Sequence, residues 1–348
     1  MGAVLRQSGM STNRYFTLVS RPDGELADAN LGRHEQPVAA TKDGQIQVRT
    51  TCISIDPTNR IWMSDIPQYM PPIAIGEVVR ALAVGVVEQS AHPGFAVGDR
   101  VIGLLGWATH PTLVPETSFV GALPPQLPLS DAKVLSLLGL TTGPTAYFGL
   151  LEIGQPRAGE TLVVDAAAGA VGSLVGQIGK LKGCRVVGIA GGPEKCRYVT
   201  ETLGFDACID YKNEDVGKGL DEHCPSGIDV CFENVGGPIL DEILLRMNLN
   251  GRVVICGLIE GYNSANAGTK AIGPANFFMT LMRRLRVQGF IVTDFAPRFP
   301  DATAELLAWA QAGKLATLED VRTGFDALPD TLRQLLRGEK HGKLVLQP

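Results

Sequence analysis

The sequence predicts an α/β protein in which a doubly wound parallel sheet is joined to a β-rich, barrel-like domain. Three observations support this prediction. Residues 161–204 contain a strand, a small-residue turn, a helix and a second strand in succession. Strands and helices then alternate to about residue 313, whereas short strands with Pro- and Gly-rich turns fill the chain before residue 138. The 348 residues suffice for two such domains.

The composition is that of an ordinary soluble globular protein, with 45% hydrophobic and 19% charged residues. A net charge of −5 gives no general attraction to nucleic acid or to an anionic membrane. The sequence shows no signal peptide in residues 1–10 and no later membrane span. Its seven cysteines are scattered. We therefore expect a protein of the reducing cytoplasm that binds neither nucleic acid nor membrane.

The β-rich part and its junction are predicted from residue patterns. Residues 45–55 and 78–89 are expected strands. Residues 132–151 predict two helices broken around Gly143-Pro144, and a last strand at 343–346 is expected to return to the first domain. The expected domain limits are 1–138 with 317–348 for the β-rich catalytic domain, and 139–316 for the domain with the parallel sheet.

The order of elements after residue 160 is the one that a dinucleotide-binding turn requires. Residues 161–164 form an apolar run too short for a helix, and residues 173–182 carry apolar side chains at helical spacing. The small-residue turn between them, residues 166–172, is a variant of G-x-G-x-x-G. Ala167 stands in the first glycine position of this motif.

The two remaining glycines of the turn each have a physical role. Gly169 lets the backbone approach a pyrophosphate, and Gly172 lets the helix pack closely on the strand. Amides at the helix start offer donors and a partial positive charge to phosphates. The alternative is tight packing without a ligand. We favour a cofactor, and expect it to contact Ala168, Gly169, Ala170, Val171 and Gly172.

The end of the second strand distinguishes NADP from NAD. An NAD site usually places an acid there for the ribose 2′-hydroxyl, whereas a 2′-phosphate favours a cation. This chain has Gly191 and Gly192, followed by Lys195 in the first turn of the next helix. Tyr211, after the following strand, is a second candidate contact. These residues predict NADP, with a solvated surface Lys195 beside Glu194 as the alternative.

The alternation continues through four more strands and three helices. Asn234 and Gly257 lie in the segments that follow two of the strands, where the backbone passes close to the cofactor. With right-handed crossovers the strands complete a sheet of six, and the last strand is its expected edge. The predicted strands are 207–210, 228–232, 252–256 and 287–292, and the predicted helices are 214–223, 238–247 and 275–284.

Several stretches match one known family in the family's own order: residues 54–57, 71–77, 97–101, 139–147, 166–172, 180–191 and 233–237. Through them the chain resembles the medium-chain dehydrogenase/reductases, most closely the zinc-independent branch of prostaglandin reductases, leukotriene dehydrogenases and alkenal double-bond reductases. The resemblance implies a Rossmann cofactor domain and a GroES-like catalytic domain split between the N-terminal part and the C-terminal tail. It also implies NADPH, a substrate cleft between the domains and a homodimer.

The residues predict no metal. A structural zinc in this superfamily needs four closely spaced cysteines, which the chain lacks, and Gly76 stands where the family's zinc histidine would be. Cys52 has no partner at ligand spacing, and the adjacent His223 and Cys224 have no further ligands beside them. Without zinc, the usual Lewis acid for alcohol oxidation is missing.

Tyr262 is the expected catalytic residue. Hydride transfer to the β-carbon of an enone or enal builds negative charge on the carbonyl oxygen, and a donor aimed at that oxygen stabilises it. Tyr262 lies in the loop after the strand that ends at Cys256, and a phenol stays protonated at neutral pH. By resemblance, the tyrosine of this loop has that role. The alternative is a residue that merely caps an exposed loop.

Two further site residues rest on the resemblance. Tyr69, beside two prolines, is expected to line the cleft opposite the nicotinamide, with ordinary loop packing as the alternative. Lys340 replaces a family asparagine that contacts the cofactor, and a lysine there can reach a phosphate. The possible apolar pocket walls are Trp62, Ile66, Phe277 and Phe278.

The expected function is NADPH-dependent reduction of the carbon–carbon double bond of an α,β-unsaturated ketone or aldehyde. Two alternatives stay open. One is NADPH-dependent quinone reduction, and the other is a NADPH-binding protein without turnover, because such folds host many functions. The expected partners are a small-molecule enone or enal and a second copy of the chain.

Overall fold

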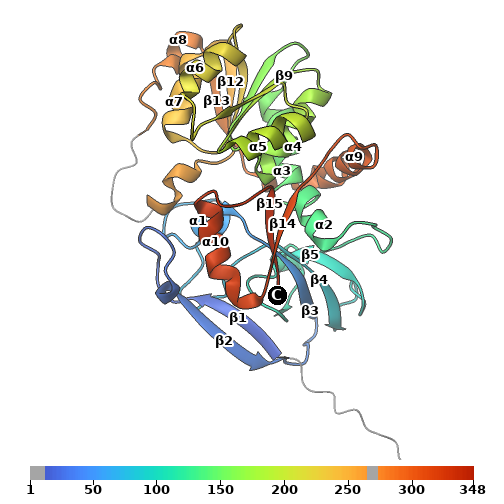
Figure 1. The fold of residues 1–348 in the computed structure, drawn as a ribbon. Helices are drawn as coiled ribbons and strands as arrows, with labels where there is room; N and C mark the ends of the chain where they lie inside the picture. The colour runs from blue at the N-terminus through green and yellow to red at the C-terminus, as the bar shows by residue number, and fades with distance from the viewer. Residues whose placement is uncertain (1–11, 265–272) are drawn as a thin grey trace, which may run out of the picture.

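The computed structural model describes residues 12–264 and 273–348. Within these residues the chain forms two large sheets at opposite ends of the molecule (Figure 1). One is parallel, with six strands in the order β10-β9-β8-β11-β12-β13, and the other joins strands from both ends of the chain. The predicted α/β class is confirmed. None of the helices in these ranges has the length and apolar character that a membrane crossing needs.

The parallel sheet is covered by helices on both faces, because alternate strand residues point to opposite sides. Leu162, Val186 and Val254 pack against α3, α4 and α9, whereas Val163 and Val187 pack against α6 and α7. The bounds are β8 (Thr161–Val164), α4 (Ala170–Leu181), β9 (Arg185–Ala190), α5 (Pro193–Arg197), β10 (Ala207–Asp210), α6 (Val216–His223), β11 (Ile228–Glu233), α7 (Gly237–Leu245), β12 (Met247–Ile255), α8 (Met279–Arg283), β13 (Arg286–Gly289), α3 (Gly143–Phe148) and α9 (Phe299–Gln311).

The last helix and strand of this sheet are shorter than the sequence predicts. Helix α8 begins at Met279 because the preceding segment is held in turns, where the backbone N–H of Asn276 donates to Asp241 Oδ1 at 2.9 Å. It ends where Arg284 adopts a left-handed conformation (φ 49°). Strand β13 ends at Gly289 rather than at residue 292, and it forms one edge of the sheet.

The second sheet has seven strands, with β14 and β15 contributed by the C-terminal tail. Strand β15 is antiparallel to β3, and Val345 lies opposite Ser54, so the predicted return of the tail is confirmed. The domain limits stay a prediction. The bounds are β3 (Ile46–Ser54), β4 (Ala83–Ser90), β5 (Arg100–Gly103), β6 (Thr112–Leu113), β7 (Gly121–Ala122), β14 (Glu319–Thr323) and β15 (Lys343–Gln347), with a separate hairpin of β1 (Thr12–Leu18) and β2 (Leu31–Pro37).

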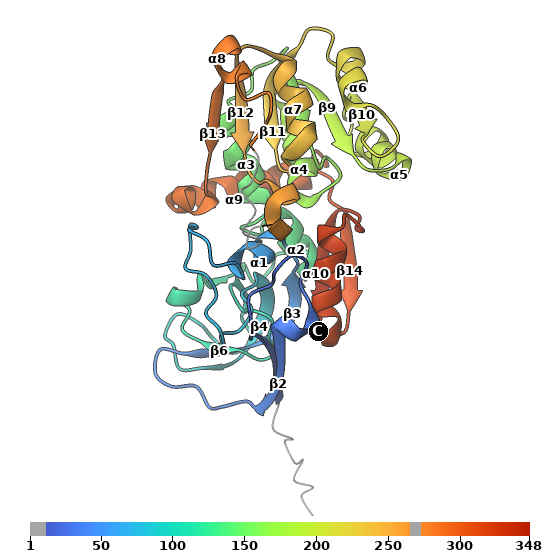
Figure 2. The ribbon, with the colours of Figure 1, turned by 90° about the vertical axis from the view of Figure 1, so that its left-hand side faces the viewer.

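Helices at the junction position one wall of the site. Helix α2 (Asp131–Leu137) and helix α3 lie between the two sheets, and α10 (Leu328–Leu336) packs beside the tail strands (Figure 2). A Cβ on Gly143 would lie 1.8 Å from the carbonyl oxygen of Leu137, so only glycine permits this approach of α3 to α2. The broken pair of helices predicted around Gly143 is confirmed.

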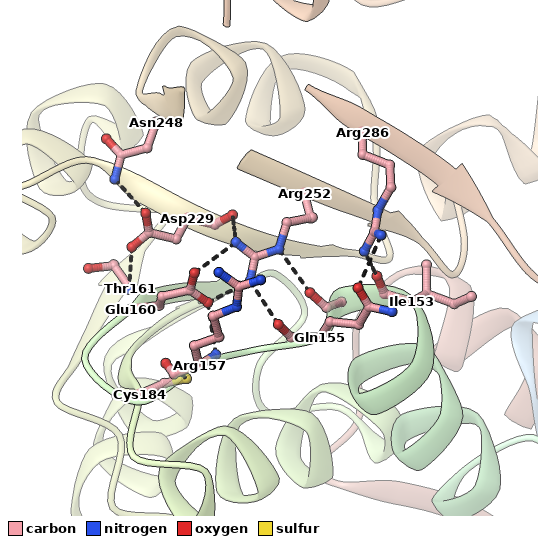
Figure 3. A network of polar contacts seen from close by, with 11 residues as sticks. Ile153, Gln155, Arg157, Glu160, Thr161, Cys184, Asp229, Asn248, Arg252 and Arg286 are labelled. Carbon is pink, nitrogen blue, oxygen red and sulfur yellow. Dashed lines mark hydrogen bonds and ion pairs between the residues drawn. The ribbon is translucent and has the colours of Figure 1, made fainter. Parts of the chain in front are cut away.

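A polar network ties together the amino ends of the parallel strands (Figure 3). Arg252 on β12 pairs with Glu160 at 2.5 Å, and Asp229 accepts from the backbone N–H of Thr161 at 2.8 Å and from Asn248 at 2.8 Å. Burial alone would raise the pKa of Glu160, but Arg252 lowers it overall. The network therefore lies at the end of the sheet opposite to the carboxyl ends of the strands, where ligands bind in such folds.

Candidate active site

A cavity of about 290 Å³ lies where the carboxyl ends of the parallel strands meet the β-rich part of the chain. Ala168, Gly191, Gly192, Lys195 and Tyr211, which the sequence also nominates, do not line it. The predicted site residues that do line it are Tyr69, Gly169, Ala170, Val171, Gly172, Asn234, Gly257, Tyr262 and Lys340.

The small-residue turn after β8 needs its glycines for close approach. A Cβ on Gly172 would lie 2.5 Å from the carbonyl oxygen of Ala166, and one on Gly169 would lie 2.9 Å from the same atom. No side chain caps the start of α4 at Ala170, so its first amides are open to a ligand. Ala168 is buried behind the turn and faces the protein core instead.

Two lysines flank the loop of the C-terminal tail that reaches this turn. Gly342 forms an isolated β-bridge with Gly169, which brings the tail onto the turn. Lys340 Nζ donates to the carbonyl oxygen of Gly342 at 3.0 Å, and Lys195 Nζ to that of Gly338 at 2.7 Å. Burial, with the charges of Lys195 and Lys343, lowers the pKa of Lys340 to about 8.

The residues predicted to contact the 2′-phosphate do not line the cavity but pack against one another in part. A Cβ on Gly191 would lie 2.8 Å from the ring of Tyr211, so that ring packs directly over the glycine. The backbone N–H of Gly192 donates to Asp210 Oδ1 at 2.7 Å. Asp210 is an acid that the sequence reasoning missed at this end. Its Oδ2 accepts from the Asn213 side-chain amide and its Oδ1 also accepts from the Lys212 N–H, so the carboxylate is satisfied locally.

Tyr262 places its hydroxyl at the cavity wall. The hydroxyl oxygen accepts a hydrogen bond from the backbone N–H of Leu258 at 3.3 Å and lies 3.1 Å from where a Cβ on Gly257 would be. Burial is the main cause that raises the pKa of Tyr262 to about 12. The phenol is therefore protonated at neutral pH, and its O–H hydrogen has no partner among the described residues.

Tyr69 lines the same cavity from the β-rich side, but its hydroxyl is already engaged. It bonds to Thr58 Oγ1 at 2.7 Å and accepts from Trp62 Nε1 at 3.0 Å. Burial raises the pKa of Tyr69, although both of these hydrogen bonds lower it. Both tyrosines are thus neutral phenols, and among the described residues the Tyr262 hydroxyl has one partner whereas that of Tyr69 has two.

A buried carboxyl pair under the turn was missed by the sequence reasoning. Asp165 directly follows β8, Glu233 ends β11, and both are fully buried. Asp165 Oδ1 accepts from the backbone N–H of Asn234 at 2.7 Å and from its side-chain amide at 3.1 Å. Burial and the neighbouring Glu233 raise the pKa of Asp165 well above its usual range. Asp165 orients Asn234, and the position of Asp165 directly after a strand was the available signal.

The apolar wall is partly the predicted one. Trp62 lines the cavity, whereas Ile66 does not, and Phe277 and Phe278 are more than half exposed elsewhere. Phe290, which the sequence reasoning did not nominate, completes the wall. In the two described ranges, no three His, Cys, Asp or Glu side chains gather in an arrangement that could hold a metal ion.

Comparisons with known proteins agree on one family. A family described as the N-terminal domain of oxidoreductase matches residues 14–120, and one described as zinc-binding dehydrogenase matches residues 170–311. The chain is 42% identical over 338 residues to the NADPH-dependent curcumin reductase of Escherichia coli, covering 96% of each chain. It is 37% identical over 303 residues to the NADP(+)-dependent 2-alkenal reductase of Nicotiana tabacum, covering 86% of each.

The chain belongs to the medium-chain dehydrogenase/reductases. The crystal structure of CurA from Vibrio vulnificus in complex with NADPH has a TM-score of 0.89 and 40% identity, over 96% of this chain and 98% of that one. Within the medium-chain dehydrogenase/reductases, the relatives place the chain in the branch that includes the alkenal and prostaglandin reductases, as the sequence predicts. The chain is therefore an oxidoreductase.

Proposed function

We propose that the protein uses NADPH to reduce the carbon–carbon double bond of α,β-unsaturated ketones and aldehydes. The observation that carries the proposal is a single cavity shared by the dinucleotide turn at Gly169–Gly172 and the phenol of Tyr262, whose O–H has no acceptor in the described part of the chain. The named activities of the curcumin and alkenal reductases support the same reaction class.

The cofactor fits the residues that are present. The turn residues Gly169–Gly172 line the cavity, and no side chain caps the first amides of α4. Lys195 and Lys340 bond only to carbonyl oxygens in the described chain, so their charges are available to phosphates. The Tyr211 ring packs over Gly191 at the expected 2′-phosphate end. When bound, NADPH supplies a hydride for the β-carbon of the substrate.

Tyr262 supports the substrate oxygen. As negative charge develops on the carbonyl oxygen, the protonated phenol donates a hydrogen bond to it and then a proton to the enolate. The backbone N–H of Leu258 holds the phenol oxygen in place. The Tyr69 hydroxyl is hydrogen-bonded to both Thr58 and Trp62, so we assign it the role of shaping the cavity wall.

We also propose that two copies pair through β13, since this strand is an edge of the parallel sheet and Gln288 and Gly289 on it are exposed.

All seven cysteines are free thiols. Free thiols are typical of the reducing cytoplasm, which is the location that we propose for the protein.

The test is a screen of NADPH oxidation after chelator treatment, with enals, enones and quinones, and with products identified by NMR. Saturated ketones or aldehydes support the proposal. Hydroquinones alone would favour the quinone reductase, and tight NADPH binding without any turnover would favour the non-catalytic alternative.

The variant Lys195→Ala should raise KM for NADPH about tenfold and leave KM for NADH unchanged. The surface variant Lys218→Ala is the matched control.

A further inference from the structure

Two cysteines of the cofactor-binding part lie against each other. The Sγ atoms of Cys196 on α5 and Cys208 on β10 are 2.8 Å apart. All seven cysteines lie within the described residues, and no other pair among them is in contact. Of the other five, Cys52, Cys184, Cys224 and Cys231 are buried, and the partly exposed Cys256 lines the active-site cavity.

The pair has the accessibility that a reaction needs and lacks the ligands that a metal needs. Cys196 and Cys208 are both partly exposed. In the described part of the chain, no third His, Cys, Asp or Glu side chain completes a metal-binding group with them. Neither residue lines the active-site cavity, so the proposed reduction does not use them.

We propose that Cys196 and Cys208 form a reversible disulfide by exchange with a low-molecular-weight disulfide such as oxidised glutathione. The Cys196 thiolate attacks one sulfur of the reagent, which breaks the reagent's S–S bond and releases one thiolate. Cys208 then attacks the Sγ of Cys196 and releases the second thiolate, so two protein thiols are oxidised and one disulfide is reduced to two thiols.

The environment of the two thiols sets the kinetics. Burial raises the pKa of Cys196, although the hydrogen bond from Cys208 lowers it, and burial with the Cys196 contact raises the pKa of Cys208 further. Cys196 is therefore the first nucleophile, and exchange accelerates as pH rises because the thiolate is the reactive form. A stabilised thiolate would favour the reduced dithiol form over the disulfide. These two thiols lack that stabilisation, so it does not oppose disulfide formation.

The bond would tie together the two elements beside the expected 2′-phosphate contacts. Cys196 directly follows Lys195, and Cys208 lies three positions before Tyr211. A cross-link between residues 12 positions apart fixes α5 on β10. The disulfide form should bind NADPH more tightly than the dithiol form, because the cross-link pre-organises the expected 2′-phosphate contacts. This expectation rests on the proposed function.

The chemical test uses the full-length protein with oxidised glutathione at about pH 8.5. After acid quenching and tryptic digestion, mass spectrometry should find peptide 196–197 joined to peptide 198–212, with two hydrogens lost and full reversal by dithiothreitol. Cys196→Ser and Cys208→Ser should abolish this species, and Cys224→Ser should retain it. The absence of the joined peptide in the wild-type protein, or stable glutathione adducts on both cysteines, would overturn the proposal without relying on any variant.

Cofactor binding gives a second readout. The NADPH dissociation constant should be at least about threefold lower in the disulfide form than in the dithiol form, with no change in Cys196→Ser under the same oxidant. Equal or weaker binding by the disulfide form would refute the coupling. A joined peptide in a protein that binds no NADPH in either form would refute the proposed cofactor while leaving the disulfide intact.

Discussion

The hydroxyl of Tyr262 has one hydrogen-bonding role occupied and one open. Leu258 donates to its oxygen, while burial keeps the proton on it at neutral pH. Tyr69, in the same cavity, has two partners for its hydroxyl, Thr58 and Trp62. Local bonding is therefore consistent with the order that the sequence predicts, with Tyr262 as the first candidate donor and Tyr69 as the second.

Removing the Tyr262 hydroxyl should slow turnover without weakening NADPH binding. We expect Tyr262→Phe to lower kcat about 100-fold, the cost of one lost oxyanion donor, while the NADPH dissociation constant is unchanged. Steady-state kinetics with an enone and fluorescence titration of NADPH measure the two quantities. Tyr15→Phe, which removes an exposed hydroxyl bonded to Gln36, is the control. A kcat within twofold of wild type would refute the assigned role.

Lys340 should make NADPH binding pH-dependent. With a pKa of about 8, its ammonium is charged at neutral pH and loses its proton as pH rises. The NADPH dissociation constant should therefore increase between about pH 7 and about pH 9.5. Lys340→Gln should flatten this rise, and Lys340→Arg, which stays charged, should bind tightly across the whole range. An identical pH profile in wild type and Lys340→Gln would contradict the phosphate contact.

At the scale of elements, the β8–turn–α4 unit was readable from sequence because its signals are local. A short apolar run, small residues and helical spacing lie in one continuous stretch, and each reflects backbone geometry. The Asp165–Glu233 pair was not readable, since it depends on β8 and β11 being neighbours. Lys195 likewise meets the tail at Gly338, 143 positions away, through packing that no local pattern encodes.

The turn depends on Gly172 more than on its other residues. We expect Gly172→Ala to raise KM for NADPH more than tenfold and to lower stability by about 1–3 kcal/mol, because its Cβ would press on the Ala166 carbonyl and lift α4 from β8. Kinetics and urea unfolding measure both effects. Gly121→Ala, at a glycine with open space around it, should change neither. A Gly172→Ala protein with wild-type stability and wild-type KM for NADPH would contradict the requirement for glycine at this position.

At the scale of the whole molecule, the site exists because the tail crosses from one sheet to the other. Strand β15 belongs to the β-rich sheet, while Gly342 just before it bridges to Gly169 of the dinucleotide turn. Lys343 anchors the crossing through a buried ion pair with Asp56 at 2.5 Å. The sequence predicts the return of the tail, but only the folded chain places Lys340 beside Lys195.

If two copies pair through β13, a single substitution on this strand should convert the dimer into a monomer. In a two-fold pairing of β13 edges, Gln288→Lys would place like charges near each other and oppose association. Sedimentation velocity should give a dimer for wild type and a monomer for Gln288→Lys. The exposed Gln89→Lys on β4 should remain dimeric. A monomeric wild-type protein, or an unchanged mass in Gln288→Lys, would rule out this interface.

The most direct test of the proposed reaction follows the transferred hydrogen. Chelator-treated enzyme is given NADPH deuterated at the transferring position, together with a simple enone, and the product is examined by NMR. Hydride transfer to an activated double bond, with Tyr262 supporting the oxygen, predicts deuterium on the β-carbon of a saturated ketone. Deuterium on the former carbonyl carbon of an allylic alcohol would contradict it.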